Sequence, residues 1–89
     1  MPQISDVKIK KIKENILAFL YENSPKALYT VTIARELARD EEFIKKLLQQ
    51  LEKAALVSRI KKNTKGIVYS RREKWLLTAK AYEAYKTLQ

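Results

Sequence analysis

The period of the hydrophobic pattern changes at about Ala55. Before this residue, apolar side chains recur every three or four positions, as in amphipathic helices, whereas after it they tend to alternate, as in strands. A strand pair that follows helices in so short a chain must pack on them, because an isolated two-stranded hairpin is at best marginally stable in water. The pattern therefore predicts an α+β fold that is mostly helical.

Three helices are predicted before the change of period. The first covers 6–22 and stops before Pro25, since proline disfavours helical backbone at the preceding residue. The second covers 31–39, with Thr30 as its N-cap, and follows a short extended segment. The third covers 41–55. Its apolar stripe consists of Ile44, Leu47, Leu48, Leu51 and Ala55.

The segment 56–72 is predicted to form a β-hairpin. Its two arms, "LVSRIKK" and "IVYSRR", are rich in β-branched and aromatic residues and flank the loop "NTKG". This loop contains the only glycine of the chain, Gly66, which we expect in a left-handed conformation. A last helix at 78–88 is capped by Thr78. The hairpin is expected to pack on the helices through Leu56, Ile60, Val68 and Trp75.

Positive charge is concentrated in the last third of the chain. The net charge is +9; residues 1–55 hold ten basic and eight acidic residues, but residues 56–89 hold nine and two. Such asymmetry favours a polyanionic partner, either nucleic acid or an anionic membrane surface, and the alternative is a solubilising surface. The hairpin and the residues just after it contribute most of this charge, through Arg59, Lys61, Lys62, Lys65, Arg71, Arg72 and Lys74.

Composition excludes several classes of chemistry. The chain has no cysteine and no histidine, so thiol nucleophiles, imidazole acid–base catalysis and the usual zinc sites are absent. Asp40, Glu41 and Glu42 are explained by a capped helix start, where the helix dipole favours negative charge. We therefore predict no catalytic residue, metal, cofactor or small-molecule effector. The first twenty residues mix charge with apolar residues, which predicts neither a signal peptide nor a membrane span and hence an intracellular, cytoplasmic protein with no membrane partner.

Two stretches of the chain carry a family resemblance: "TVTIARELARDEEFIKKLLQQLEKAALVSRI" and "WLLTAKAYEAY". They resemble winged helix-turn-helix domains, in particular small prokaryotic regulators of the MarR, PadR and ArsR kind. The second stretch is similar to the "LT-x-K-G" passage from the wing to the last helix of that family. The resemblance covers about residues 6–85 and implies one domain over 1–89, with a three-helix core, a two-stranded basic wing and a C-terminal helix. The first stretch, "TVTIARELARDEEFIKKLLQQLEKAALVSRI", matches the family at Ile33, Ala34, Ile44, Leu51, Glu52, Lys53, Leu56 and Val57.

The sequence departs from the family pattern at two kinds of position. Ala38 and Ala55 stand where the family usually has glycine, which predicts a turn before the third helix that is tighter or more helical than usual. The third helix begins with carboxylates, whereas a helix that enters the major groove usually presents neutral or basic residues at its start.

The resemblance implies sequence-specific binding to double-stranded DNA and regulation of transcription. The third helix would enter the major groove, and the wing would contact phosphates or the minor groove. Thr30 and Thr32, at the start of the second helix, are candidates for phosphate contacts. The candidate base-reading residues are Lys45, Lys46, Gln49 and Gln50. The candidate wing contacts are Arg59, Lys61, Lys62, Lys65, Arg71 and Arg72.

A homodimer is expected because one domain of this size offers few base contacts, and two copies can read two half-sites. Tyr82, Tyr85 and Leu88 of the last helix are the candidate interface, although the same residues can simply close the core.

Two other functions remain open from the sequence. One is a winged-helix module for protein–protein interaction, with the acidic start of the third helix on a basic partner. The other is nucleic-acid binding without sequence preference. Lys8, Lys10, Lys11 and Lys13 on the first helix are interpreted as a solvated face and serve as a control in both cases.

Overall fold

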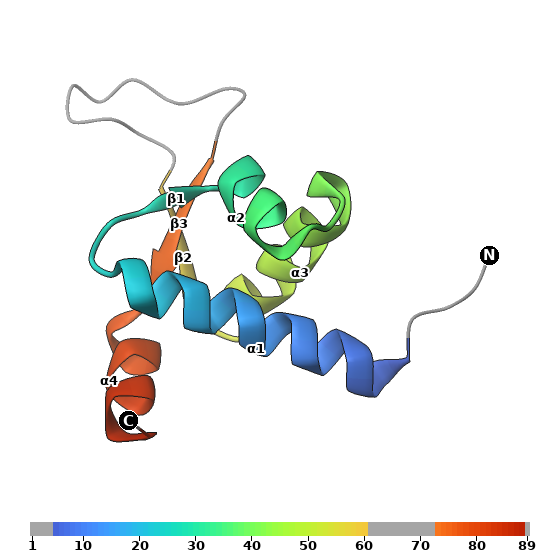
Figure 1. The fold of residues 1–89 in the computed structure, drawn as a ribbon. Coiled ribbons are helices and arrows are strands. Elements are labelled where there is room, and N and C mark those ends of the chain that lie inside the picture. The colour runs from blue at the N-terminus through green and yellow to red at the C-terminus, as the bar shows by residue number, and fades with distance from the viewer. Residues whose placement is uncertain (1–4, 61–72, 89) are drawn as a thin grey trace.

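The computed structural model describes residues 5–60 and 73–88 (Figure 1). The four helices begin and end within two residues of the predicted ranges. The predicted hairpin loop, with Gly66, lies outside the described residues, as do the whole second arm and the last two residues of the first arm. In chain order the elements are α1 (Asp6–Asn23), β1 (Leu28–Tyr29), α2 (Thr30–Leu37), α3 (Glu41–Lys53), β2 (Val57–Ile60), β3 (Lys74–Leu77) and α4 (Ala79–Leu88).

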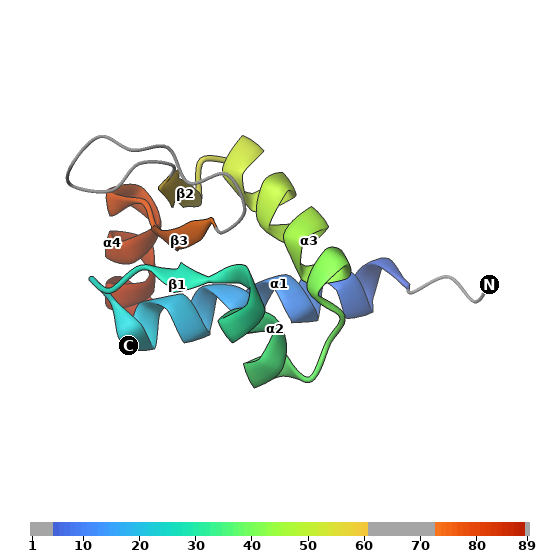
Figure 2. The ribbon, with the colours of Figure 1, turned by 90° about the horizontal axis from the view of Figure 1, so that it is seen from above.

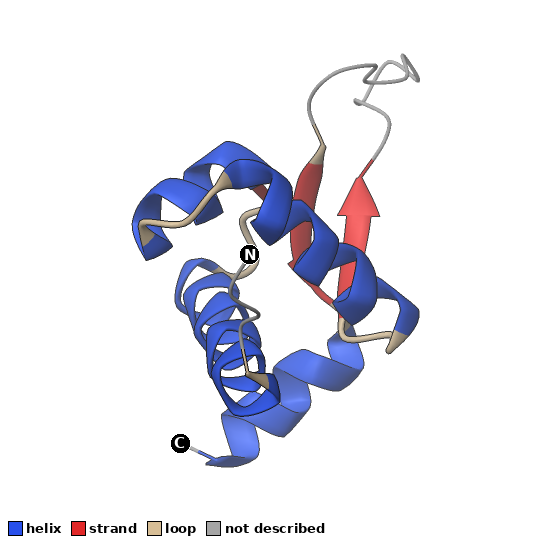
Figure 3. Cartoon of the chain, turned by 90° about the vertical axis from the view of Figure 1, so that its right-hand side faces the viewer, coloured by secondary structure: helices blue, strands red, loops and turns tan. Residues whose placement is uncertain are grey.

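The strands form one antiparallel sheet in the order β1-β3-β2, and β2 and β3 stand beside the helices (Figure 3). β2 and β3 are the two strands of the predicted wing, and β1, in the segment predicted to be extended, adds a third strand to their sheet. The two residues of β1 pair with Trp75 and Lys74 and occupy the edge of β3 that β2 leaves open. β3 lies beyond the predicted hairpin range of 56–72, and it becomes the central strand.

The core lies where the helices meet the sheet. α1 runs through the molecule with α2, α3 and the sheet on one side and α4 on the other (Figure 1). Seen from above, α2 and α3 lie at one end of the sheet and α4 at the other (Figure 2). This packing confirms the predicted mostly helical α+β fold. The buried apolar residues are Ile12, Ile16, Leu20, Leu28, Ile33, Ala34, Ile44, Leu47, Leu48, Leu51, Val57, Trp75, Leu77 and Ala81.

Trp75 is the largest of the fully buried side chains. It lies on the central strand, opposite Leu28 of β1 and opposite Arg59 of β2. Its indole N–H donates a hydrogen bond of 2.7 Å to the hydroxyl oxygen of Thr30, the first residue of α2. A buried indole N–H without a partner would cost about 1–3 kcal/mol, so this bond lets tryptophan occupy the core.

In the described part of the chain, side-chain caps begin three of the four helices. Ser5 accepts a bond from the amide of Lys8, Asp40 from that of Phe43, and Thr78 from that of Ala81. The prediction that Thr30 caps the second helix is wrong. Tyr29 occupies that cap position without a side-chain bond, because the hydroxyl of Thr30 points into the core toward Trp75.

Ala38 and Ala55 both adopt left-handed backbone, with φ values of 54° and 61°. Each follows a helix, and the next amide bonds back into that helix: Arg39 N–H to the carbonyl of Ala34, and Leu56 N–H to that of Leu51. These positions therefore keep the geometry that glycine usually provides. The expectation of a tighter or more helical turn is wrong, and so is the placing of Ala55 in the buried stripe of α3, since this residue is exposed.

Replacing Ala55 by glycine should stabilise the protein. The left-handed region costs an L-residue about 1–2 kcal/mol, and glycine removes that cost but adds entropy to the unfolded chain. We expect Ala55→Gly to raise the free energy of unfolding by about 0.5–1 kcal/mol in urea denaturation.

Ala54→Gly is the matched control, because Ala54 is the neighbouring residue with a negative φ of −82°. This variant should be destabilised, since glycine brings only its entropic cost there. Equal effects of the two substitutions would contradict the left-handed assignment of Ala55.

Candidate nucleic-acid interface

The solvent face of α3 carries the predicted base-reading residues. The helix buries Ile44, Leu47, Leu48 and Leu51, so the side chains between them face outward. Among the candidates, Lys45, Lys46 and Gln50 are exposed, and Gln49 is half-buried. The helix presents a mixed basic and amide surface after an acidic first turn.

Lys45 lies in a shallow hollow between α2 and α3, with a volume of about 430 Å³. Arg35 of α2 lies on the same hollow and adds a second cation beside the candidate helix. Arg35 was not among the predicted contacts, although its position next to the inward Ile33 and Ala34 already indicated an outward side chain. The α2–α3 hollow is lined by Tyr29, Thr30, Val31, Arg35, Glu41, Lys45 and Glu73.

The remaining candidates of α3 line a second hollow of about 470 Å³, between α3 and β2. The structure therefore brings Lys46, Gln49 and Gln50 together and places Lys45 on the other hollow. The α3–β2 hollow is lined by Lys46, Gln49, Gln50, Glu52, Lys53 and Arg59.

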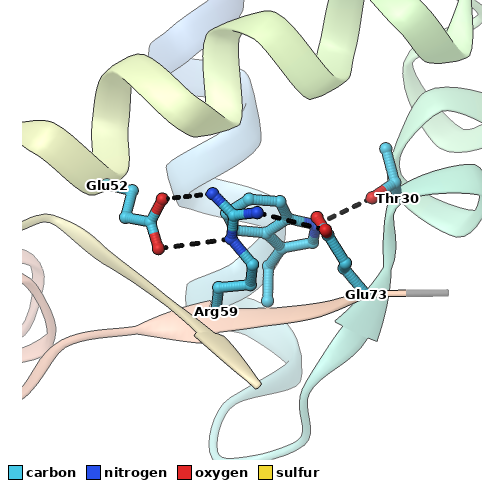
Figure 4. A network of polar contacts seen from close by, with 5 residues as sticks. Thr30, Glu52, Arg59 and Glu73 are labelled. Carbon is cyan, nitrogen blue, oxygen red and sulfur yellow. Dashed lines mark hydrogen bonds and ion pairs between the residues drawn. The ribbon is translucent and has the colours of Figure 1, made fainter. Parts of the chain in front are cut away.

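Arg59 lies between two carboxylates (Figure 4). Its Nη2 and Nε donate to Oε1 and Oε2 of Glu52, at 2.6 and 3.3 Å, and its Nη1 donates to Oε1 of Glu73 at 3.1 Å. The guanidinium also lies over the ring of Trp75, 5.0 Å from the ring centroid. The hydrogen bond to Glu52 raises the pKa of Arg59, against the opposing effect of burial, and the charges of Glu73 and Glu52 raise it further. Arg59 therefore stays charged.

This network changes the role assigned to Arg59. The sequence predicts a DNA-contacting residue of the wing, but the guanidinium faces two acidic partners within the protein, and its side chain is only 18% exposed. We therefore do not retain Arg59 as a phosphate contact. Glu52 and Glu73 are its partners, and no periodicity or motif in the sequence pairs residues that are seven and fourteen positions away from Arg59.

The two threonines of α2 have different surroundings. Thr30 is 7% exposed and accepts the bond from Trp75, so it is a core residue rather than a surface contact. Thr32 is half-buried and stays a prediction. Of the predicted wing contacts, Lys61, Lys62, Lys65, Arg71 and Arg72 lie outside the described residues.

The predicted interface residues on α4 partly pack within the chain. The rings of Tyr82 and Tyr85 lie 5.3 and 5.6 Å from that of Tyr21 on α1, measured between centroids. The Tyr85 hydroxyl donates to the carbonyl of Glu14 at 3.1 Å, and burial raises the pKa of Tyr85. Leu88, in contrast, is 80% exposed. Two of the three residues thus attach α4 to α1.

The described residues hold neither a metal cluster nor a membrane span. Within 5–60 and 73–88, no group of three or more acidic side chains is placed to hold a metal ion. In the same part of the chain, no helix combines the length and apolar character needed to cross a membrane.

No protein-family model matches the sequence, and no curated protein matches it. Solved structures do match. A variant of ZitR from Lactococcus lactis is 28% identical with a TM-score of 0.72, and the match covers 93% of this chain and 52% of that chain. A variant of S. aureus MepR bound to an oligodeoxyribonucleotide is 26% identical with a TM-score of 0.68, over 86% of this chain and 55% of that chain.

The S. aureus MepR–DNA complex is 25% identical with a TM-score of 0.68, and it covers 93% of this chain and 70% of that chain. This chain thus spans about half the length of the first two proteins. ZitR and MepR are regulators of the MarR type. The structural matches confirm the resemblance inferred from the sequence: the chain has the winged-helix fold of MarR-type regulators.

Proposed function

We propose that this protein binds double-stranded DNA at specific sequences and regulates transcription, acting at the nucleoid. In this proposal α3 enters the major groove, and the basic hairpin contacts phosphates or the minor groove. The observation that carries it is the solvent face of α3, where Lys45, Lys46, Gln49 and Gln50 lie beside the start of the hairpin at β2. The DNA-bound state of S. aureus MepR supports the same partner.

Base reading in this proposal depends on the middle of α3. A glutamine can make a bidentate contact with adenine, and a lysine can reach guanine or a phosphate. Gln49 and Lys46 line the α3–β2 hollow, and Lys45 and Arg35 line the α2–α3 hollow. The basic side chains therefore lie on both sides of the glutamine side chains of α3. Arg35 enters the proposal as an additional phosphate contact from α2.

One observation favours a second function, namely a protein-interaction module. Asp40, Glu41 and Glu42 place three carboxylates at the start of α3, where they would repel phosphates. Asp40 is explained by its bond to the amide of Phe43, and Glu41 and Glu42 by the helix dipole. A carboxylate can also accept a bond from cytosine. The acidic turn is thus compatible with DNA binding, and we rank the interaction module second.

The hairpin should provide most of the salt dependence of DNA binding. We expect Lys62→Ala/Lys65→Ala/Arg71→Ala to weaken binding to a mixed-sequence duplex. The log–log salt slope should fall by about 0.9 for each phosphate that the variant no longer neutralises. Fluorescence anisotropy at several salt concentrations measures both quantities.

The matched control is Lys8→Ala/Lys10→Ala/Lys13→Ala on α1, which removes the same charge. This variant should keep most of the affinity and slope of the wild type. If both variants weaken equally, the protein binds as a general polycation, and a preference for single-stranded oligomers would favour binding without sequence preference.

We also propose a homodimer in which the exposed end of α4 contributes to the interface. Since Tyr85 packs on α1, the proposal now depends on Leu88 and on the exposed edge of Tyr82. We expect sedimentation equilibrium to detect a dimer and Leu88→Asp to raise its dissociation constant at least about tenfold, because a carboxylate would be buried without a partner.

Val7→Asp provides the control, since Val7 is 81% exposed at the far end of α1. It should leave the dimer unchanged. A wild-type protein that remains monomeric at working concentrations would contradict the homodimer.

A further inference from the structure

We propose that Arg59 is a positioning residue that fixes the start of the wing to α3, so that the hairpin and the candidate recognition helix keep one relative orientation. The inference rests on the proposed DNA-binding function and deepens it, because it assigns a role to a cation that does not itself contact DNA. We call Glu52, Arg59 and Glu73 the wing clamp.

The wing clamp joins the end of α3 to both ends of the described hairpin strands. Glu52 lies in the last turn of α3, Arg59 on β2, and Glu73 directly before β3. The bond from Arg59 Nη1 to Glu73 Oε1, at 3.1 Å, therefore closes the two ends of the hairpin on each other. The two bonds from Arg59 to Glu52 attach the closed end to α3 (Figure 4).

The guanidinium fork suits this task better than a lysine would. Its planar donors reach a bidentate carboxylate on one side and a second carboxylate on the other, which a single ammonium group cannot reproduce. The guanidinium carbon, Cζ, lies over the ring of Trp75, its cross-strand partner, 5.0 Å from the ring centroid. Because Trp75 is fully buried and bonded to Thr30 of α2, the clamp is seated on the core.

Arg59 also offsets the cost of burying the Glu73 carboxylate. Its Oε2 atom is buried and has no hydrogen-bond partner within residues 5–60 and 73–88. A partly buried carboxylate with one unsatisfied oxygen needs a nearby cation to offset its lost hydration. Arg59 provides this positive charge at Oε1 of Glu73 and is shared with Glu52. Without Arg59, the carboxylates of Glu52 and Glu73 would stay unneutralised beside the proposed path of the DNA.

For the variant Glu73→Gln, the wing clamp predicts a loss of DNA affinity, whereas the change in net charge alone predicts a gain. Glu73→Gln adds one positive charge to the net charge, so a general polycation should bind DNA more tightly after this change. If the carboxylate instead holds the wing in place, its loss lowers the population of the binding-competent arrangement. We expect Glu73→Gln to weaken binding to a mixed-sequence duplex about tenfold, as when the competent fraction falls to about a tenth.

Glu83→Gln on α4 is the matched control, because it makes the same change in charge at an exposed site. It should bind as tightly as the wild type or slightly more tightly. Binding by Glu73→Gln that is as tight as that of Glu83→Gln overturns the proposal. Far-UV circular dichroism at the assay temperature verifies that each variant is folded.

Arg59→Met separates positioning from phosphate contact. A positioning residue contributes no released counterion, so this variant should bind more weakly at every salt concentration with the log–log slope of the wild type. A slope reduced by about 0.9 would instead identify Arg59 as a phosphate contact and overturn the proposal.

Trp75 provides a readout that needs no DNA. It is the only tryptophan of the chain and is fully buried in the wild type, so acrylamide quenching of its fluorescence reports on the packing under the clamp. We expect greater quenching in Glu73→Gln and Arg59→Met but not in Glu83→Gln. If the wild type binds no duplex, the proposed DNA-binding function fails, but the quenching experiment still tests the wing clamp. Quenching that is unchanged in both Glu73→Gln and Arg59→Met overturns the wing clamp.

Discussion

The packing of the buried Trp75 side chain holds the sheet and the helices in one arrangement. Its strand is central because β1 pairs on one side and β2 on the other, and Leu28 and Arg59 lie opposite the tryptophan in the two registers. A fully buried indole requires a partner for its N–H, and Thr30 provides one from the first residue of α2. One side chain thus fixes the sheet, the start of α2 and the guanidinium of Arg59 relative to one another.

This arrangement determines which charges reach the surface near α3. Arg59 is held by Glu52 and Glu73, so among the described residues near α3 the cations that remain for a polyanion are those on the outer faces of α2 and α3, such as Arg35, Lys45 and Lys46. These residues project from helices that pack on the core through their opposite faces, and helices hold side chains more firmly in place than loops do. The proposed binding to duplex DNA would use these firmly held side chains.

Much of the fold could be predicted because it follows from local rules. The stripes of α1, α2 and α3, the caps at Asp40 and Thr78, and the burial of Trp75 depend on residues a few positions apart or on strong apolar character. The pairing of β1 with β3, the bond of Trp75 to Thr30 and the wing clamp depend on contacts between residues of different elements, and no local pattern encodes them. The backbone of Ala38 and Ala55 could not be predicted for a different reason. Their left-handed backbone is imposed by the path of the chain at the cost of alanine's own preference.

The proposed function requires that α3 and the hairpin form one DNA-binding surface. Chemical-shift mapping of the ¹⁵N-labelled protein during titration with a duplex is the sharpest test of this requirement. We expect the largest shifts at Lys45, Lys46, Gln49 and Gln50 and in residues 61–72, while the amides of α1 near its lysines shift little. Comparable shifts along α1 would contradict a single binding surface, because a polycation with no defined binding face would then explain the affinity.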